Sequence, residues 1–406
     1  MRLATPDPAA PEDAGAEAVS RGEILRRFLQ GDLASLRVIL AIAVIWIVFQ
    51  SQNDRFLSAV NLTNLFLQIT AVGLISVGVV MALLIGEIDL SVGAVSGLSA
   101  AVMAVLNVKQ GWDPWLAVAA GVATGAAIGL LQGTLFTRFR IPSFVVTLAG
   151  SLSWLGALLL VLGKTGTVNL SNSSITDLAN TFYGPTVGWI VAAVSIGLFA
   201  AVTLAGHRKR VAAGVTAEPL GLLLVRIGIV AAITVVAIAI LNSDRGLPLA
   251  LLILFAFVIG FQLITTRTVF GRHLFAVGGS AEAARRAGIR VDSVRVIAFT
   301  LCSSMAAVGG IMAASRLLAV NQSSGGSNLL LEAIAGPVIA GTSLFGGRGS
   351  VWSALLGAVV IGSIANGMDL LALEASVKYM VTGGVLLAAV IVDAVARSRR
   401  QAEGRV

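Results

Sequence analysis

Long apolar stretches, separated by short polar ones, run through most of the chain. Twelve of them fall near residues 36–50, 64–86, 90–106, 115–136, 143–162, 186–205, 220–241, 247–265, 294–315, 331–345, 349–365 and 376–394. A helix needs roughly 20 apolar residues to cross about 30 Å of hydrocarbon. The pattern therefore predicts an all-α polytopic membrane protein with about 12 transmembrane helices. The stretches at 36–50, 90–106, 331–345 and 349–365 are short, so we expect them to tilt, break or re-enter.

The composition supports a membrane protein over a soluble one. The 406 residues are 57% hydrophobic and 12% charged, whereas a soluble domain is about 45–50% apolar and about 25% charged. The net charge of +8 would suggest nucleic acid in a soluble protein, but membrane proteins retain lysine and arginine on cytosolic loops. We expect the lipid bilayer, and no nucleic acid, as a partner.

The distribution of lysine and arginine predicts the orientation. With a cytosolic N-terminus and twelve crossings, 21 of the 28 basic residues face the cytosol, six face the other side, and Arg226 lies in a span. This bias predicts that both termini are cytosolic. Residues 1–34, with acidic residues amid Ala and Pro, are typical of a disordered tail. Residues 35–395 form one predicted transmembrane domain, and 396–406 form a basic cytosolic tail.

Glu87, Asp89 and Ser91 are candidate residues of a solute path. They lie between two apolar stretches with almost no loop, and charges in such places usually line water or contact a partner. The alternative is a tight cytosolic turn in which Asp89 or Ser91 caps the next helix. A catalytic or metal site is disfavoured because neither histidine of the chain, His207 or His273, is near in the sequence.

Several other residues predict packing rather than chemistry. Gly121, Gly125, Gly129 and Gly133 form a small-residue stripe, which indicates close helix packing within the chain, with a dimer face as the alternative. The single cysteine, Cys302, lies in an apolar stretch and is expected to pack there. Glu332 is interpreted as a helix-start residue. Residues 86–98 and 346–357 are weakly similar, which indicates an internal repeat or a coincidence.

The polar segment 266–293 is predicted to be a cytosolic coupling segment. Ser280 can cap a helix over 281–287, Glu282 lies in its first turn, and Gly288 can end it in a left-handed conformation. Two turns are unstable alone, so we expect the helix to rest on another protein. A loop helix lying on lipid headgroups is the alternative, but the bulky apolar face is missing. The candidate contact residues are Gly279, Ser280, Glu282, Ala283, Ala284, Arg285 and Gly288.

Five ordered motifs resemble the permease subunit of bacterial sugar ABC importers of the ribose/xylose class. They are GEIDLSVGAVSGLSA, IPSFVVTLAG, TRTVFGRHLFAVGGSAEAARRAGIRV, EAIAGPVIAGTSLFGGRGSV and NGMDLL. The extra pair of apolar stretches near 186–241, followed by LNSDRGLP, is similar to the xylose-type permeases. The resemblance implies a homodimer in the bacterial inner membrane, a periplasmic sugar-binding protein, and a separate cytosolic ATPase chain that holds ATP and Mg²⁺.

The function predicted from these observations is import of a pentose or related monosaccharide, with D-xylose as the best candidate. Because LGKTG lacks the first glycine of a Walker A motif, the chain is expected to be a non-catalytic subunit without a cofactor or metal of its own. The alternatives are a permease for another aldose, a nucleoside or a branched-chain amino acid. A proton-coupled sugar carrier is less favoured, because the spans contain few ionisable residues.

Overall fold

Every predicted apolar stretch overlaps a helix in the computed structural model, which describes residues 33–171, 173–215 and 218–402. The twelve corresponding helices are α2 (Leu33–Gln52), α3 (Ala59–Leu84), α4 (Val92–Ala104), α5 (Pro114–Phe139), α6 (Ser143–Leu162), α8 (Pro185–Ala212), α9 (Leu220–Asn242), α10 (Leu249–Arg267), α13 (Val291–Leu317), α14 (Ser327–Ile339), α15 (Trp352–Leu370) and α16 (Ala375–Ala402).

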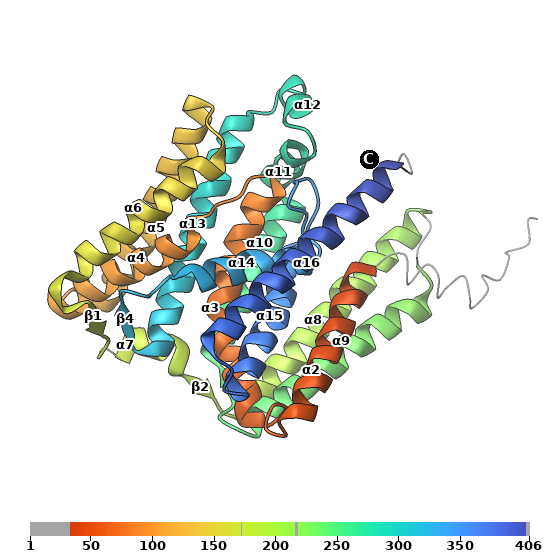
Figure 1. Cartoon of the computed structure of the whole chain (residues 1–406). Coiled ribbons are helices and arrows are strands. Elements are labelled where there is room, and N and C mark those ends of the chain that lie inside the picture. Colours follow the sequence, from red (N-terminus) through yellow and green to blue (C-terminus); the bar gives the residue numbers. More distant parts are fainter. Residues whose placement is uncertain (1–32, 172, 216–217, 403–406) are drawn as a thin grey trace, which may run out of the picture.

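Nine helices of the described chain are long and apolar enough to cross a membrane, and three further apolar helices are shorter. The predicted all-α polytopic class is confirmed. Among the shorter helices, α14 has 13 residues, which span only about 20 Å at 1.5 Å per residue. The start of α2, the end of α16 and helix α12 (Ala281–Arg286) lie on the same side of the bundle (Figure 1). Twelve crossings and cytosolic termini remain predictions.

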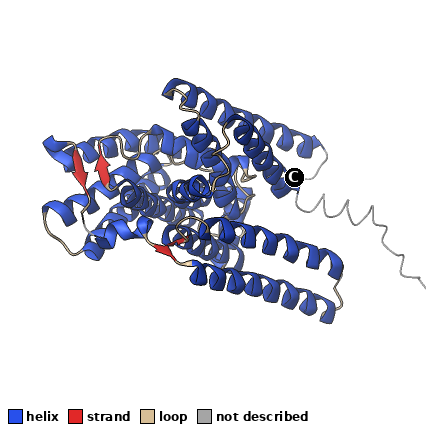
Figure 2. Cartoon of the chain, turned by 90° about the horizontal axis from the view of Figure 1, so that it is seen from below, coloured by secondary structure: helices blue, strands red, loops and turns tan. Residues whose placement is uncertain are grey.

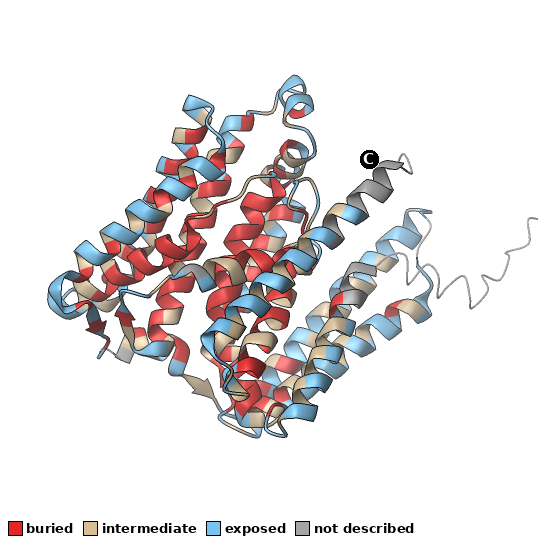
Figure 3. Cartoon of the chain, in the orientation of Figure 1, coloured by how far each residue is buried: buried red, intermediate tan, exposed pale blue. Residues whose placement is uncertain are grey.

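Helices α3 and α13 form the centre of the molecule. Most residues of α3 are buried (Figure 3), as its predominantly apolar sequence requires, and α13 packs most extensively against α5 and α3. The glycine stripe on α5 faces α13 and α4: a Cβ on Gly129 would lie 2.4 Å from the Phe299 carbonyl oxygen. The prediction that this stripe packs within the chain is confirmed. Cys302 is also buried there, as expected.

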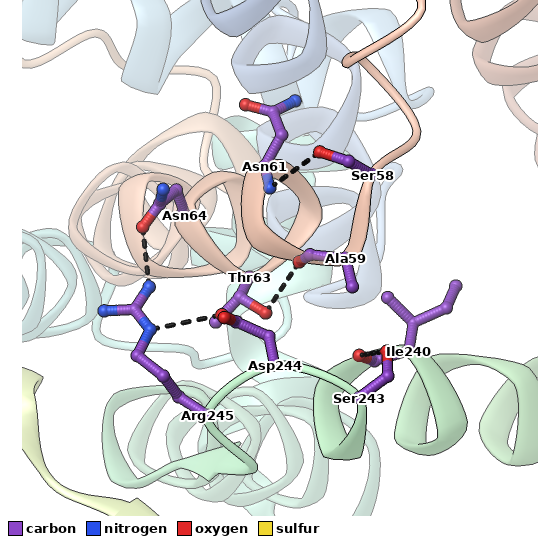
Figure 4. A network of polar contacts seen from close by, with 9 residues as sticks. All are labelled: Ser58, Ala59, Asn61, Thr63, Asn64, Ile240, Ser243, Asp244 and Arg245. Carbon is purple, nitrogen blue, oxygen red and sulfur yellow. Dashed lines mark hydrogen bonds and ion pairs between the residues drawn. The ribbon is translucent and has the colours of Figure 1, made fainter.

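Helices α8 and α9 form a peripheral pair. They pack on each other, and α9 also contacts α3, while most of their surface is exposed (Figures 2 and 3). A polar contact connects the loop after α9 to α3. Arg245 Nη2 donates to Asn64 Oδ1 of α3 over 2.7 Å (Figure 4). The same guanidinium lies 4.5 Å from the ring centroid of Phe182, which is a cation–π contact.

Short elements absent from the sequence prediction connect the spans. Helix α4 continues into a π-helical turn, η1 (Val105–Lys109), and a 3₁₀ turn, η2 (Gly163–Thr165), follows α6. The loop after it contains β1 (Thr167–Asn169), α7 (Ser173–Asn180) and β2 (Phe182–Tyr183). Strand β1 pairs antiparallel with β4 (Ala319–Asn321), and β2 with β3 (Leu247–Pro248). Helix α11 (Val269–Gly279) occupies much of the predicted coupling segment.

Two predicted boundaries differ from those of the structure. Glu332 is not a helix-start residue: α14 begins at Ser327 and has no acidic residue in its first turn, because the polar residues before the apolar stretch also join the helix. Most of the predicted C-terminal tail is helical, since α16 continues to Ala402. Residues 1–32 and 403–406 lie outside the described residues.

Candidate functional site

A cavity of about 480 Å³ lies between α3, α4, α13, α14 and α16. Small-molecule sites typically have volumes of about 300–1,000 Å³. Part of the wall consists of small apolar residues, such as Ala71, Ala100 and Ala313. The polar part comes from six elements and the loop before α14, and it comprises Gln68, Ser96, Arg316, Asn321, Ser323, Ser324, Asn328, Glu332 and Tyr379.

Close backbone contacts place the 321–326 loop in the cavity wall. A Cβ on Gly97 of α4 would lie 2.2 Å from the Ser324 carbonyl oxygen, and one on Gly325 would lie 2.1 Å from that of Gly93. Gly325 also has a φ of 74°, in the left-handed region that favours glycine. These glycines bring the loop directly onto α4, so Ser323 and Ser324 face the cavity instead of being held away by side chains.

Two opposite charges, Arg316 of α13 and Glu332 of α14, line the cavity and are partly buried. The carboxylate of Asp369, at the end of α15, acts electrostatically on both. Asp369 itself forms an ion pair with Lys378 of α16, whose neighbour Tyr379 belongs to the cavity wall. Two acidic and two basic side chains therefore lie on or beside the cavity wall.

This lining can bind a small neutral or zwitterionic polar solute. A carboxylate accepts hydrogen bonds, a guanidinium donates them, and the amides and hydroxyls do both. A molecule with several hydroxyl groups presents donors and acceptors in the same way. The side chains needed for such contacts are distributed over helices far apart in the sequence, so they converge only when the bundle is assembled.

The predicted path residues Glu87, Asp89 and Ser91 do not line this cavity. Asp89 is 2% exposed, and its Oδ1 accepts hydrogen bonds from the Ser91 backbone N–H (2.8 Å) and hydroxyl (2.6 Å). Ser91 is the N-cap residue of α4, but its side chain makes no capping bond. Asp89 instead holds the turn before α4 closed. A path role for these residues remains a prediction.

Gln132 of α5 completes this buried cluster. Ser91 Oγ lies 2.6 Å from Asp89 Oδ1 and 3.0 Å from Gln132 Oε1, yet one hydroxyl has only one hydrogen to donate. The reversed amide, with Nε2 toward Ser91, lets Ser91 donate to Asp89 and accept from Gln132. Gln132 Nε2 and Trp154 Nε1 are both buried without a partner among the described residues, and they lie 2.3 and 3.0 Å from a Cβ built on Gly150. The reversed amide therefore brings the acceptor Oε1 near the Trp154 N–H.

Glu87 joins three elements. Its Oε2 accepts a hydrogen bond from Ser143 Oγ at the start of α6 (2.6 Å), and its Oε1 lies 3.1 Å from Arg295 Nη2 on α13. Both charged side chains are largely buried, with 18% of Glu87 and 26% of Arg295 exposed. These contacts give Glu87 a structural role at the end of the bundle where α12 lies.

The predicted coupling helix, α12, forms as its sequence predicts. Ser280 Oγ caps α12 by accepting from the Ala283 N–H (3.2 Å), Glu282 forms an i,i+4 ion pair with Arg286 (3.1 Å), and Gly288 has a φ of 82°. The helix is slightly shorter than predicted, ending at Arg286. The sequence is enough to predict this helix, because capping and left-handed termination involve residues only a few positions apart.

The exposure of the candidate contact residues divides them into two groups. Ala284 is 4% exposed, so it holds α12 against its own chain and does not face a partner directly. The residues that present an exposed surface are Gly279, Ser280, Glu282, Ala283, Arg285 and Gly288. A contact of this surface with an ATPase subunit remains a prediction.

Comparison with known proteins identifies the family. Residues 61–390 match the family described as branched-chain amino acid transport system / permease component. The chain belongs to this permease family. It is 35% identical to the xylose transport system permease protein XylH of Escherichia coli (strain K12), over 89% of this chain and 92% of that protein. The resemblance to permeases of the ribose/xylose class is thereby confirmed.

Two further relatives support the same class. The xylose transport system permease protein XylH of Haemophilus influenzae is 34% identical over 88% of this chain and 95% of its own length. The ribose import permease protein RbsC of Bacillus subtilis is 30% identical over 91% of this chain and 95% of its own length. No solved structure matches the chain. The chain is thus a multi-pass inner-membrane permease, a non-catalytic membrane subunit rather than an enzyme.

Proposed function

We propose that this chain is the membrane-spanning subunit of an ATP-driven importer for D-xylose or a related pentose. The observation that carries the proposal is the cavity within the bundle, whose wall presents the donors and acceptors suited to a small polyhydroxylated solute. The relatives named as xylose and ribose permeases support the same solute class.

The proposed assembly contains two copies of this chain, a cytosolic ATPase subunit and a periplasmic sugar-binding protein. ATP and Mg²⁺ belong to the ATPase subunit, and this chain carries no cofactor of its own. The surface around α12 is the proposed contact with the ATPase subunit. The sugar enters from the side opposite α12, where the loops containing α7 and β4 lie (Figure 1).

One competing function is import of a branched-chain amino acid, which the family description favours. The opposite charges of Arg316 and Glu332 could bind the carboxylate and ammonium groups of such a zwitterion. The two functions differ in how strongly they depend on these charges. A sugar hydroxyl can bind a neutral amide in place of a charged group, whereas the amino acid would leave its own charges unpaired in the cavity.

The experiment is uptake of radiolabelled solutes into vesicles that contain the whole importer with its binding protein and ATP. We expect saturable uptake of xylose by the wild-type protein and none of leucine. We expect Glu332→Gln and Arg316→Gln to lower xylose uptake by at most about tenfold, because each replaces a charged hydrogen bond of about 1.5–3 kcal/mol with a neutral one of about 0.5–1.5 kcal/mol. ATP-dependent leucine uptake without sugar uptake would contradict the proposal. Uptake abolished by a protonophore while ATP remains would indicate a proton-coupled carrier instead.

A further inference from the structure

Three backbone segments meet at glycines next to the coupling helix. Gly278 lies at the end of α11, two residues before the cap of α12. A Cβ at this position would lie 1.8 Å from the carbonyl oxygen of Leu84, the last residue of α3, and 2.5 Å from the backbone nitrogen of Gly347. Real Cβ atoms do not approach backbone atoms so closely, so only glycine fits here without a backbone shift.

The end of α3 and the loop at 346–347 are also in direct contact with each other. The Gly347 N–H donates to the Leu84 carbonyl oxygen over 3.0 Å. A Cβ on Gly346 would lie 2.7 Å from the Gly86 nitrogen and 2.8 Å from the Gly278 carbonyl oxygen. Gly86 and Gly346 both have positive φ values, 76° and 83°. We call Gly86, Gly278, Gly346 and Gly347 the glycine junction.

The glycine junction contains the starts of the two weakly similar segments, 86–98 and 346–357. The first leads through the Asp89 turn into α4, and the second leads into α15. Gln262 of α10 holds the second segment: its Oε1 accepts from Ser350 Oγ and from the Val351 N–H, each over 3.1 Å. The two similar segments therefore meet at their starts, and the end of α11 contacts both the second segment and Leu84, just before the first.

The helices that leave the junction also build the solute cavity. Helix α3 carries Gln68, α4 carries Ser96 and Gly97, and α14, which precedes the second segment, carries Glu332. Backbone-to-backbone contact without intervening side chains leaves little room for independent movement. A displacement of α11 and α12 must therefore move the end of α3 and the start of the 346–357 segment together.

We infer that Gly278 is the positioning residue through which the coupling segment acts on the cavity. Movement of α12 reaches the turn before α4 and the α14–α15 connection through this junction, in addition to its contacts with α13. This inference rests on the proposed function, because it assumes that an ATPase subunit moves α12. It assigns Gly278 a role in energy coupling that is separate from the binding of the ATPase subunit.

The test compares two glycines in the complete importer. Gly278→Ala introduces the clash with Leu84 and Gly347, whereas no neighbouring atom of the described chain lies within 4 Å of a Cβ on Gly260 of α10, which is outside the proposed ATPase contact. We expect both variants to co-purify with the ATPase subunit like the wild type. Sugar-stimulated ATP hydrolysis and uptake should fall by about tenfold or more in Gly278→Ala, and Gly260→Ala should retain wild-type coupling.

Equal coupling in Gly278→Ala and the wild type would overturn the inference, and so would equal losses in the two variants. If Gly278→Ala does not accumulate in the membrane, hydrogen exchange of the wild-type importer tests the inference instead. Binding of a non-hydrolysable ATP analogue should then change exchange in both 84–91 and 343–351, and a change in neither segment or in one alone would contradict the inference. Failure of the proposed function is distinct, because the wild-type importer would then take up no sugar.

Discussion

The carboxylate of Glu87 and the guanidinium of Arg295 form an ion pair, with 3.1 Å between Oε1 and Nη2, that joins the turn after α3 to the first turns of α13. Since both side chains are largely buried, removal of either charge leaves the other poorly solvated. We expect Glu87→Gln and Arg295→Gln each to destabilise the protein by about 1–3 kcal/mol, somewhat below the cost for a fully buried pair. The double variant should be less destabilised than the sum of the two.

The measurement is the thermal unfolding of the four proteins in detergent, together with sugar uptake at saturating and low concentrations. A structural role predicts lower melting temperatures with an unchanged concentration dependence of uptake. Strictly additive effects on stability would show that the ion pair contributes nothing. A shift in the half-saturating sugar concentration without loss of stability would instead support the path role.

Asp89 is predicted to act through the two hydrogen bonds that it accepts from Ser91. Asp89→Asn retains an acceptor oxygen, whereas Asp89→Ala leaves the Ser91 N–H buried without its partner, at a cost of about 1–3 kcal/mol. We therefore expect Asp89→Ala to lower the melting temperature and the amount of folded protein more than Asp89→Asn does. An Asn variant that is stable but does not transport would show that the charge itself is needed, as a path role requires.

The coupling helix is predicted to be sensitive to proline at its centre but not at its start. Ala284→Pro removes the N–H that donates to the Ser280 carbonyl oxygen over 2.9 Å, and proline costs roughly 3 kcal/mol inside a helix. Ala281→Pro is the matched control, because proline is well tolerated at the first helical position and Ser280 already has an extended backbone.

Co-purification of the ATPase subunit and sugar-stimulated ATP hydrolysis provide the readout for these two variants. We expect Ala284→Pro to lose coupling at normal membrane levels and Ala281→Pro to retain it. Wild-type coupling in Ala284→Pro would show that α12 is a loop helix without a role in the complex. This result would leave the sugar cavity unaffected.

The predicted orientation can be tested by labelling two exposed positions. Asp177, on α7, and Ala283, on α12, are both exposed, and the buried Cys302 can be replaced by alanine to remove the native thiol. In intact cells, a membrane-impermeant thiol reagent should label Asp177→Cys but not Ala283→Cys. Inverted vesicles should give the reverse pattern. Labelling of both positions from one side would exclude the arrangement with cytosolic termini.

Features set by neighbouring residues could be predicted from the sequence. The apolar stretches became helices, Ser280 became a cap, and Gly288 took a left-handed conformation, because each depends on residues within a few positions. The glycine stripe on α5 was also predictable, since its spacing places four small residues on one face. Helix α11 was missed, because its residues combine short apolar and basic segments without the length of a span.

The cavity could not be predicted, because its residues come from distant segments. Gln68, Arg316 and Glu332 lie on three helices and converge only through the packing of α3, α13 and α14. Glu332 gave a misleading local signal, as its acidic side chain near an apparent helix start resembled a charge at a helix N-terminus. The charges of Glu87 and Asp89 were more noticeable in the sequence, but their contacts hold the turn and the neighbouring helices together.

The pairing of β2 with β3 has a consequence for how this architecture can change. Tyr183, just before α8, pairs directly with Leu247, just after α9, and paired residues of antiparallel strands have Cα atoms about 4.5–5.5 Å apart. The chain thus leaves the core and returns to it at one place, as in domains that accept an inserted segment. A short turn could therefore replace the α8–α9 hairpin while the chain still runs from α7 into α10, and the replacement would remove the contacts of α9 with the cavity helix α3.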